Sequence, residues 1–481
     1  MDEIRIGLDF GTHQTKICVC RIPDEGHGIP EYEFFKFIDL KGEEKYFLPS
    51  VVQINKDDTV SYGYVDPEDE KEGLPYPQLE AIPPVDENNI KDDAEALFVK
   101  YSSGDLNDEE GKEAITKMLS LKYEKDKLAY DEMLAKAKAK YDEEIVEYNS
   151  ERNLFRYFKM STFADYSWDC KYSSKLLCVW YLAYVLFLLE ERYPDGFYIN
   201  MGVPTDDKSF RQMRELGTSI LISAFHLVED VYEKDISAFL NANVRELMIN
   251  TDIPEFSEED KDYYFINIFP EAYASLIGLT SKGKLSEGMS INADIGGGTT
   301  DISFFIVKDR IPKIYKYWSI PRGLNYIAKM SGFDYSEKDF VKNAHQEIID
   351  KFNHKKEEIV YNLSRILIEL LRGSGIHRSN LFNALQDRIV VYNGGGSTYM
   401  QLTTPMYRFT DVIIVNDELW QEEQVKEKNK VGKLFSLLIT AYGLSIARDD
   451  SDVVLCDINK IFAQYYKEED YERKEIDKDV C

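Results

Sequence analysis

The stretch Ile291-Asn292-Ala293-Asp294-Ile295-Gly296-Gly297-Gly298-Thr299-Thr300-Asp301-Ile302-Ser303-Phe304-Phe305 decides the fold of this 481-residue chain. Apolar residues on both sides of three glycines predict two strands joined by a tight turn. Because glycine has no Cβ, successive N–H groups of the turn can converge on phosphate oxygens. The carboxylates of Asp294 and Asp301 would hold Mg²⁺, mainly through water, since Mg²⁺ prefers oxygen ligands and keeps much of its hydration. We therefore predict a metal–phosphate site here.

The beginning of the chain repeats this pattern. Segments 4–8 and 16–20 are expected strands, and the turn Asp9-Phe10-Gly11-Thr12-His13-Gln14 joins them. Either hairpin alone would be an ordinary glycine turn. Two hairpins, each with an acid and a glycine turn, predict a clamp on one metal–phosphate group. The pattern is not a dinucleotide-binding fingerprint, because a strand follows Gly298 where that motif needs a helix, and there is no Walker loop.

A third glycine-rich segment, Gly394-Gly395-Gly396-Ser397, follows an expected strand at 388–392. The backbone can approach a flat nucleoside there, and a helix is expected to follow, with an N-terminus that favours anionic groups. Further on, Gly443 lies in a helix-like run, where glycine costs about 1 kcal/mol relative to alanine. Close approach of a neighbouring element or of the nucleotide would explain this glycine.

From about residue 4 to 448, these segments resemble the actin, sugar-kinase and heat-shock ATPase superfamily and are most similar to the nucleotide-binding domain of DnaK-type chaperones. The resemblance implies an α/β fold with two actin-like, ribonuclease-H-like lobes. The first lobe would span residues 1–290, with a charged helical insertion at about 66–158. The second would span 291–481, with a reduced helical subdomain at about 336–385. The implied ligands are ATP or ADP with Mg²⁺, and the implied activity is ATP hydrolysis with low turnover.

The resemblance also implies roles for single residues. Asp9, Asp294 and Asp301 would organise the Mg²⁺ and the attacking water. The β- and γ-phosphates would be cradled by Gly11, Thr12, His13, Gly296, Gly297, Gly298 and Thr299, with the Gly323 turn beside them. Gly395, Gly396 and Ser397 would line the nucleoside. Tyr399 stands where the family carries an arginine that stacks on adenine, and its ring could stack instead.

Two further catalytic candidates have ordinary explanations as well. Lys159 resembles the family's lysine that reaches the γ-phosphate, but a solvated lysine capping the preceding helix would give the same pattern. Glu271 follows Pro270, whereas the family has its glutamate before the proline, where Phe269 stands here. Proline followed by an acid is also favourable at a helix start. We therefore expect slow hydrolysis, since one lost polar group can cost about 10²-fold or more.

Composition limits location and partners. The 87 acidic and 58 basic residues leave a net charge of -29, which disfavours binding to nucleic acids and to anionic membranes. Any bound phosphate would therefore depend on backbone amides and a metal ion. Scattered cysteines and an acidic N-terminus predict a reduced, cytoplasmic protein. The longest apolar run, 176–189, is too short for the ~20 residues of a membrane span and predicts a buried helix.

Apolar residues at helical spacing predict a long amphipathic helix in the insertion: Leu134, Ala137, Tyr141, Ile145, Tyr148 and Phe155. The helix either decorates a lobe or docks a partner. Few residues follow Arg448, so the β-sandwich with which chaperones grip unfolded peptide is not expected. We favour an ATPase whose lobe closure regulates a protein partner. A nucleotide-dependent filament and a small-molecule kinase remain alternatives.

Overall fold

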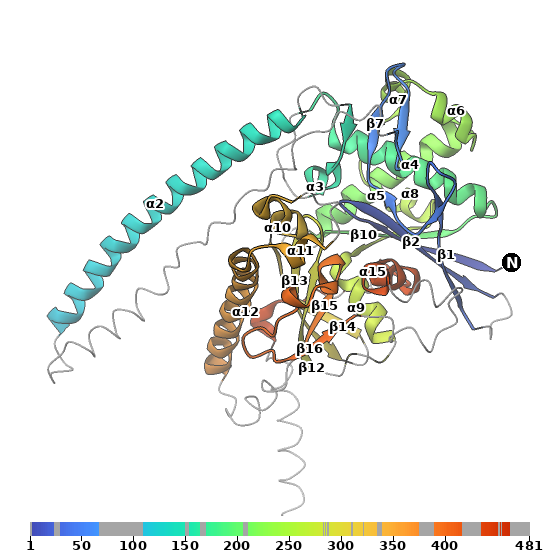
Figure 1. Ribbon diagram of the computed structural model, residues 1–481. Helices are drawn as coiled ribbons and strands as arrows, with labels where there is room; N and C mark the ends of the chain where they lie inside the picture. Colours follow the sequence, from blue (N-terminus) through green and yellow to red (C-terminus); the bar gives the residue numbers. More distant parts are fainter. Residues whose placement is uncertain are drawn as a thin grey trace, which may run out of the picture. The chain divides into compact units, whose positions relative to one another are not determined.

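The computed structural model describes most of the chain and divides it into two compact units, Met1–Leu74 with Glu151–Cys481, and Pro75–Ser150. The larger unit contains both predicted hairpins, and the smaller contains helix α2 (Glu109–Asn149) (Figure 1). The described residues are 2–23, 29–66, 109–149, 153–163, 170–204, 210–281, 283, 285, 288–308, 311–320, 322–333, 339–374, 389–415, 434–450, 453 and 455–461.

The first sheet of the larger unit carries the N-terminal hairpin. Its strand order is β3-β2-β1-β10-β11, and β2 also pairs with β6. β1, β2 and β3 form an antiparallel meander, while β10 and β11 run parallel to β1. The strands are β1 (Glu3–Phe10), β2 (Gln14–Ile22), β3 (Glu31–Phe34), β6 (Leu48–Pro49), β10 (Tyr198–Val203) and β11 (Ile266–Pro270).

The second sheet carries the glycine-rich hairpin in the same topology. Its order is β14-β13-β12-β15-β16, with β12, β13 and β14 antiparallel and β15 and β16 parallel to β12. The two sheets therefore repeat one pattern, a meander extended by two parallel strands beside its first strand. The strands are β12 (Gly288–Ile295), β13 (Thr300–Lys308), β14 (Ile311–Ile320), β15 (Ile389–Asn393) and β16 (Asp411–Ile414).

Two helices each follow a strand of one sheet in sequence but pack against the other sheet. α9 (Glu271–Ser281) follows the last strand of the first sheet but packs against β14, and α15 (Phe435–Ile446) follows the last strand of the second sheet but packs against β1 and β2 (Figure 1). The two helices also pack against each other. A Cβ on Gly443 would lie 1.7 Å from the carbonyl oxygen of Ala274, so only glycine permits this approach. The predicted close neighbour of Gly443 is confirmed, and it is α9.

The remaining elements cover the sheets or form small sheets of their own. The helices are α3 (Phe158–Phe163), α4 (Ser174–Arg192), α5 (Phe210–His226), the π-helix η2 (Leu227–Val231), α6 (Ile236–Asn241), α7 (Val244–Asn250), α8 (Glu258–Tyr263), α10 (Leu324–Ser331), α11 (Phe340–Asn343), α12 (Gln346–Ser374) and the 3₁₀ turns η3 (Gly395–Thr398), η4 (Met400–Leu402) and η8 (Ile458–Lys460). The short strands are β4 (Phe37–Ile38), β5 (Glu44–Lys45), β7 (Val52–Ile54), β8 (Val60–Tyr62) and β9 (Leu154–Phe155).

Several sequence predictions are confirmed and two are corrected. The chain is α/β, both hairpins form, and the apolar run 176–189 lies in the buried helix α4. Strand β14 and helix α10 were not predicted. The glycine loop after β15 continues as 3₁₀ turns, not as an α-helix. The long helix predicted to reach Phe155 is shorter than expected: α2 ends at Asn149, and Phe155 belongs to β9.

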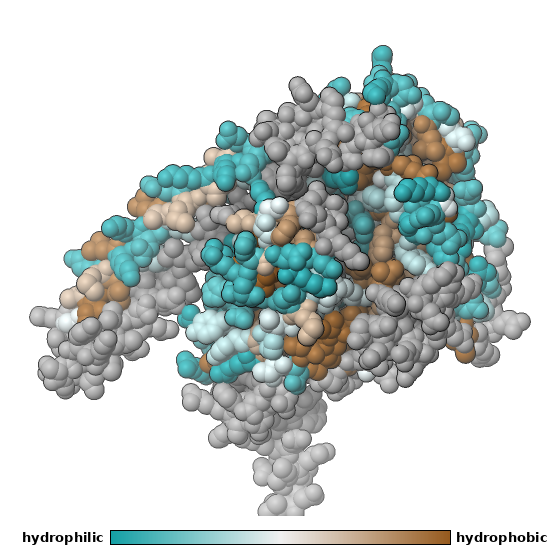
Figure 2. Space-filling view, viewed as in Figure 1, coloured by the Kyte–Doolittle hydropathy of each residue, from teal (hydrophilic) through white to brown (hydrophobic). Residues whose placement is uncertain are grey.

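Helix α2 has apolar residues on more than one side. The predicted Leu134 and Ala137 are half-buried and Tyr141 is buried, whereas the side chains of Ile145 and Tyr148 lie outside the described ones. Exposed apolar side chains, interspersed with hydrophilic ones (Figure 2), are Met118, Leu121, Leu128 and Met133. In the parts of the chain that the structure describes, no helix has the length and apolar character to cross a membrane.

A buried lysine joins α12 to the segment after the glycine loop. Lys356 donates to the carbonyl oxygen of Leu402, and its Nζ lies 4.9 Å from the ring centroid of Tyr392. Burial lowers the pKa of Lys356 from 10.5 to about 7. The folded chain therefore holds this proton less tightly than the unfolded chain does.

The free energy of unfolding should consequently rise with pH between about 7 and 10.5, by up to about 1.4 kcal/mol per pH unit from this group. Lys356→Met should be more stable than the wild type at pH 7 and should lack this part of the pH dependence. Urea unfolding of both proteins at pH 7, 8 and 9 measures it. If the free energy of unfolding changes with pH equally in both proteins, Lys356 stays charged in the folded chain.

Candidate functional site

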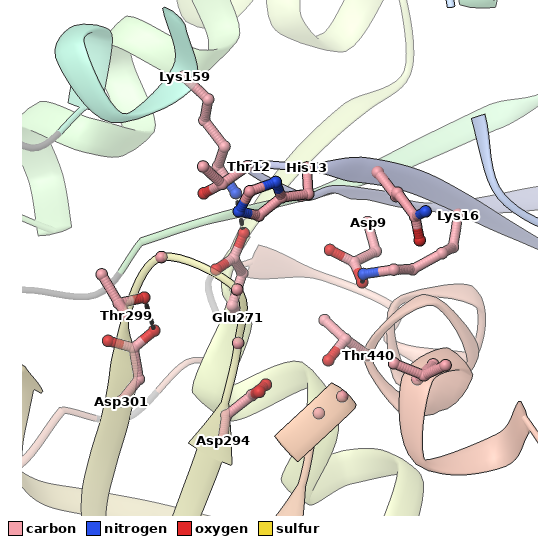
Figure 3. Close-up of a pocket in the computed structure, with 18 of the residues that line it drawn as sticks. Asp9, Thr12, His13, Lys16, Lys159, Glu271, Asp294, Thr299, Asp301 and Thr440 are labelled. Carbon is pink, nitrogen blue, oxygen red and sulfur yellow. Dashed lines mark hydrogen bonds and ion pairs between the residues drawn. The ribbon is translucent and has the colours of Figure 1, made fainter. Parts of the chain in front are cut away.

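The turns of the two equivalent hairpins line one cavity of about 160 Å³ (Figure 3). Gly11 from the β1–β2 turn and Gly297 from the β12–β13 turn are both in its wall. The structure thus brings together residues that are almost 300 positions apart in the sequence. The predicted site residues in the wall are Asp9, Gly11, Thr12, His13, Lys159, Glu271, Asp294, Gly296, Gly297, Gly298, Thr299, Asp301 and Gly395.

Each hairpin contributes a carboxylate at the same place, one residue before the end of its first strand. Asp9 is the cross-strand partner of Lys16, and its Oδ2 lies 2.8 Å from the lysine Nζ. Asp294 is the cross-strand partner of Asp301. One hairpin therefore pairs an acid with a base, and the other pairs two acids, so the negative charge concentrates on the second sheet.

The burial of these groups changes their protonation. Burial, and then the neighbouring Asp301, raise the pKa of Asp294 to about 7, although Lys16 acts in the opposite direction. Burial also raises the pKa of Asp301 and of Glu271. For Lys16, burial alone would lower the pKa, but the surrounding carboxylates, Asp9 first, raise it. Lys16 is therefore protonated at neutral pH, while the buried acids Glu271, Asp294 and Asp301 have raised pKa values.

Lys159 and Glu271 form an ion pair across the pocket. Lys159 is the second residue of α3 and is only 3% exposed, and its Nζ lies 5.6 Å from the ring centroid of Phe10. The explanation of Lys159 as a solvated helix cap is therefore wrong. Glu271 is the first residue of α9. The helix begins at the pocket wall, so the Glu271 carboxylate lies in the first turn of α9 and also lines the pocket.

The donor set fits a hydrated cation better than a fully ligated one. The Thr299 hydroxyl donates to Asp301 Oδ2 at 3.3 Å, and the hydroxyls of Ser319 and Tyr317 lie close enough to oppose the rise that burial causes in the pKa of Asp301. Its Oδ1 is buried without a hydrogen bond of normal geometry. A buried, unsatisfied carboxylate oxygen is unusual and suits a cation or its bound water. Among the described side chains, no group of three or more His, Cys, Asp or Glu residues is placed to hold a metal directly. Four acids and two lysines line the pocket, which leaves a negative excess.

The predicted Gly323 supports the glycine loop from behind. A Cβ there would lie 2.4 Å from the carbonyl oxygen of Gly297. The first N–H groups of α10 donate to this loop, Leu324 to the oxygen of Gly296 at 3.0 Å and Asn325 to that of Gly297 at 2.8 Å. These bonds engage the carbonyl oxygens of Gly296 and Gly297 with α10, while the Gly296 N–H closes the turn by donating to the Thr299 oxygen at 2.9 Å.

The third glycine segment reaches the pocket only with its first residues, Gly394 and Gly395. Gly396 packs against Ile295, and the Ser397 hydroxyl donates to the oxygen of Gly394 at 2.8 Å. Tyr399 packs against the core of the second sheet, with its ring centroid 6.4 Å from that of Phe340. These three predicted residues do not line the cavity.

Four residues of the wall were not predicted from the sequence: Lys16, Ser436, Leu437 and Thr440. Gln14 and Gly394, which also line it, belong to the predicted glycine loops, but no individual role was assigned to them. Lys16 had a usable signal, because the expected hairpin places it opposite Asp9. The residues of α15 had none, since no local motif marks them. The N–H of Gly394 donates to the oxygen of Ser436 at 3.0 Å, which fixes the start of α15 at the pocket.

The chain matches no model of a known protein family, and it matches none of the curated proteins either.

Proposed function

We propose that this chain binds Mg-ATP between two actin-like lobes and hydrolyses it slowly. One observation carries the proposal: two hairpins in equivalent positions of two sheets, each with an acid before a glycine turn, line a single cavity. The repeated strand order supports the finer fold assignment, a duplicated ribonuclease-H-like lobe.

The proposed phosphate contacts come from both sheets. Gly11, Thr12 and the loop 296–299 line the cavity, and the ammonium groups of Lys16 and Lys159 lie in its wall. The N–H groups of Gly11 and Gly296 donate to the backbone oxygens of Asp9 and Thr299, so the amides proposed to contact phosphate are those of Thr12 and of residues 297–299. These two lysines add to the amides that the sequence predicted as the phosphate ligands. Cationic side chains in a partly enclosed site bind phosphate more strongly than they would in water.

Asp9, Asp294 and Asp301 would hold the magnesium ion, largely through water. When bound, the ion would offset the repulsion between these carboxylates and the phosphates. Glu271 and Asp301 are the candidate proton acceptors for an attacking water, because burial raises the pKa of both. Glu271 must also leave or share its ion pair with Lys159, which is consistent with low turnover.

The proposed biological role is a nucleotide-controlled switch for a protein partner in the cytoplasm. Because the pocket wall comes from both lobes, bound nucleotide would favour the closed arrangement, and the state of the nucleotide would change surfaces that a partner contacts. Neither nucleic acid nor membrane is part of the proposal, since the chain carries a net charge of -29.

Calorimetric titration of the full chain tests the proposal. We expect ATP and ADP to bind with micromolar or tighter affinity in the presence of Mg²⁺, and much more weakly in EDTA, because the acidic pocket repels uncompensated phosphate. The absence of heat with either nucleotide, or equal affinities with and without Mg²⁺, would contradict it.

A further inference from the structure

The side chain of His13 crosses from the first hairpin to the second. A Cβ on Gly297 would lie 2.2 Å from His13 Cδ2 and 2.5 Å from Nε2, so the imidazole fills the space that this glycine leaves. His13 belongs to the β1–β2 turn (Figure 3), and Gly297 belongs to the β12–β13 turn. The two phosphate-loop candidates therefore touch each other directly at the pocket wall.

Two further side chains hold the ring in this position. Asn325, in the first turn of α10, places its Nδ2 3.0 Å from His13 Nε2 and 3.4 Å from the Tyr157 hydroxyl. The Tyr157 ring meets the imidazole edge-on, with centroids 5.0 Å apart at 90°. Tyr157 has φ 65°, a backbone conformation rare for a bulky residue, and such conformations gather at functional sites.

The protonation of His13 suits this contact. The Asn325 amide and His13 Nε2 form one hydrogen bond, and the tautomer of the imidazole sets which of the two donates. Burial, and then Arg156 and Lys16, lower the pKa of His13 to about 4. The imidazole is therefore neutral at pH 7 and serves as a structural bridge, not as a cationic phosphate ligand.

We propose that His13, Tyr157 and Asn325 form a latch that joins the two hairpins across the pocket, and that a ligand enters and leaves only when this latch opens. The first half of the proposal concerns the chain alone. The second half rests on the proposed function, because a nucleotide held by both hairpins can leave only if they separate.

Hydrogen–deuterium exchange of the ligand-free chain tests the first half. In Asn325→Ala and His13→Ala, the amides of 11–14 and 296–299 should exchange faster than in the wild type, by about fivefold for one lost hydrogen bond. The effects should not multiply in the double variant, because both changes break the same contact. Asn343→Ala and His345→Ala are matched controls, since both residues are exposed. Unchanged exchange in both latch variants would overturn the proposal.

A pair of compensating substitutions at the contact distinguishes opening of the latch from a general loss of stability. Gly297→Ala should open the latch because its methyl group collides with the imidazole, whereas His13→Ala in the same chain makes room for it. The double variant should therefore exchange more slowly than Gly297→Ala alone. Equal or faster exchange in the double variant would show that the two turns do not press on each other.

Release of a fluorescent ATP analogue with Mg²⁺ tests the second half. Asn325→Ala should release it about fivefold faster than the wild type and Asn343→Ala should not, and equal release rates would refute gating. If the wild type fails to bind the analogue, the proposed function fails and gating fails with it. The exchange experiments would still decide whether the latch exists.

Discussion

Replacing Asp294 by alanine is expected to lower the affinity of the chain for Mg-ATP by about 100-fold. The carboxylate lies in the pocket wall directly opposite Asp301 and beside Lys16, where it would fix the water shell of the metal. Calorimetric titration of wild type and variant with Mg-ATP measures the loss. Equal affinities would show that Asp294 takes no part in binding Mg-ATP, and would contradict the assignment of this cavity as the nucleotide site.

Asp294→Asn separates lost charge from lost structure. Because burial raises the pKa of Asp294 from 3.8 to about 7, its contribution lowers the free energy of unfolding as the pH rises from about 3.8 to about 7, and the loss persists above pH 7. The asparagine variant should therefore bind Mg-ATP as poorly as the alanine variant, yet resist urea at pH 8 as well as the wild type, or better by about 1 kcal/mol. Weak binding together with weak folding would indicate damage to the sheet, not to a ligand site.

The same pKa predicts how binding depends on pH. Only the ionised carboxylate holds a cation, so the affinity of the wild type for Mg-ATP should rise between pH 6 and pH 8 as Asp294 loses its proton. The asparagine variant should show a flatter profile over this range. A steep rise in both proteins would point to another titrating group, such as Glu271.

The site could be predicted from sequence wherever its signal is local. An acid, a glycine turn and flanking apolar residues lie within fifteen residues in each hairpin, so both hairpins could be placed. Lys16 follows from the same hairpin by register. Thr440 does not, because α15 reaches the pocket through its packing against β1 and α9, and these contacts span the whole chain.

Two errors have clear physical causes. The helix expected after β15 fails because Gly394 has φ 76° and because two further glycines follow it, which favours short 3₁₀ turns over a continuous helix. The predicted helix was extended too far, to Phe155, because the spacing of apolar residues alone does not locate the end of a helix. Leu154 and Phe155 instead pair with β7, and both side chains are buried.

Gly443→Ala should lower the free energy of unfolding by about 3 kcal/mol, even though alanine favours a helix by about 1 kcal/mol. The new methyl group would lie 1.7 Å from a backbone oxygen of α9, the oxygen of Ala274, so the helices must separate. Gly278→Ala is the matched control, because its methyl group would meet the movable end of the Ile439 side chain at 2.8 Å and would come no nearer than 3.3 Å to the α15 backbone, so it should cost only about 1 kcal/mol.

Separation of α9 from α15 should also disturb the pocket, because Glu271 begins one helix while Ser436 and Thr440 lie near the start of the other. Urea unfolding of both variants, followed by Mg-ATP titration of whichever stays folded, measures the two effects. Equal stability of Gly443→Ala and Gly278→Ala would mean that the two helices are not held at the distance described. The exchange of helices between the sheets would then be too loose to place residues from opposite ends of the chain around one ligand.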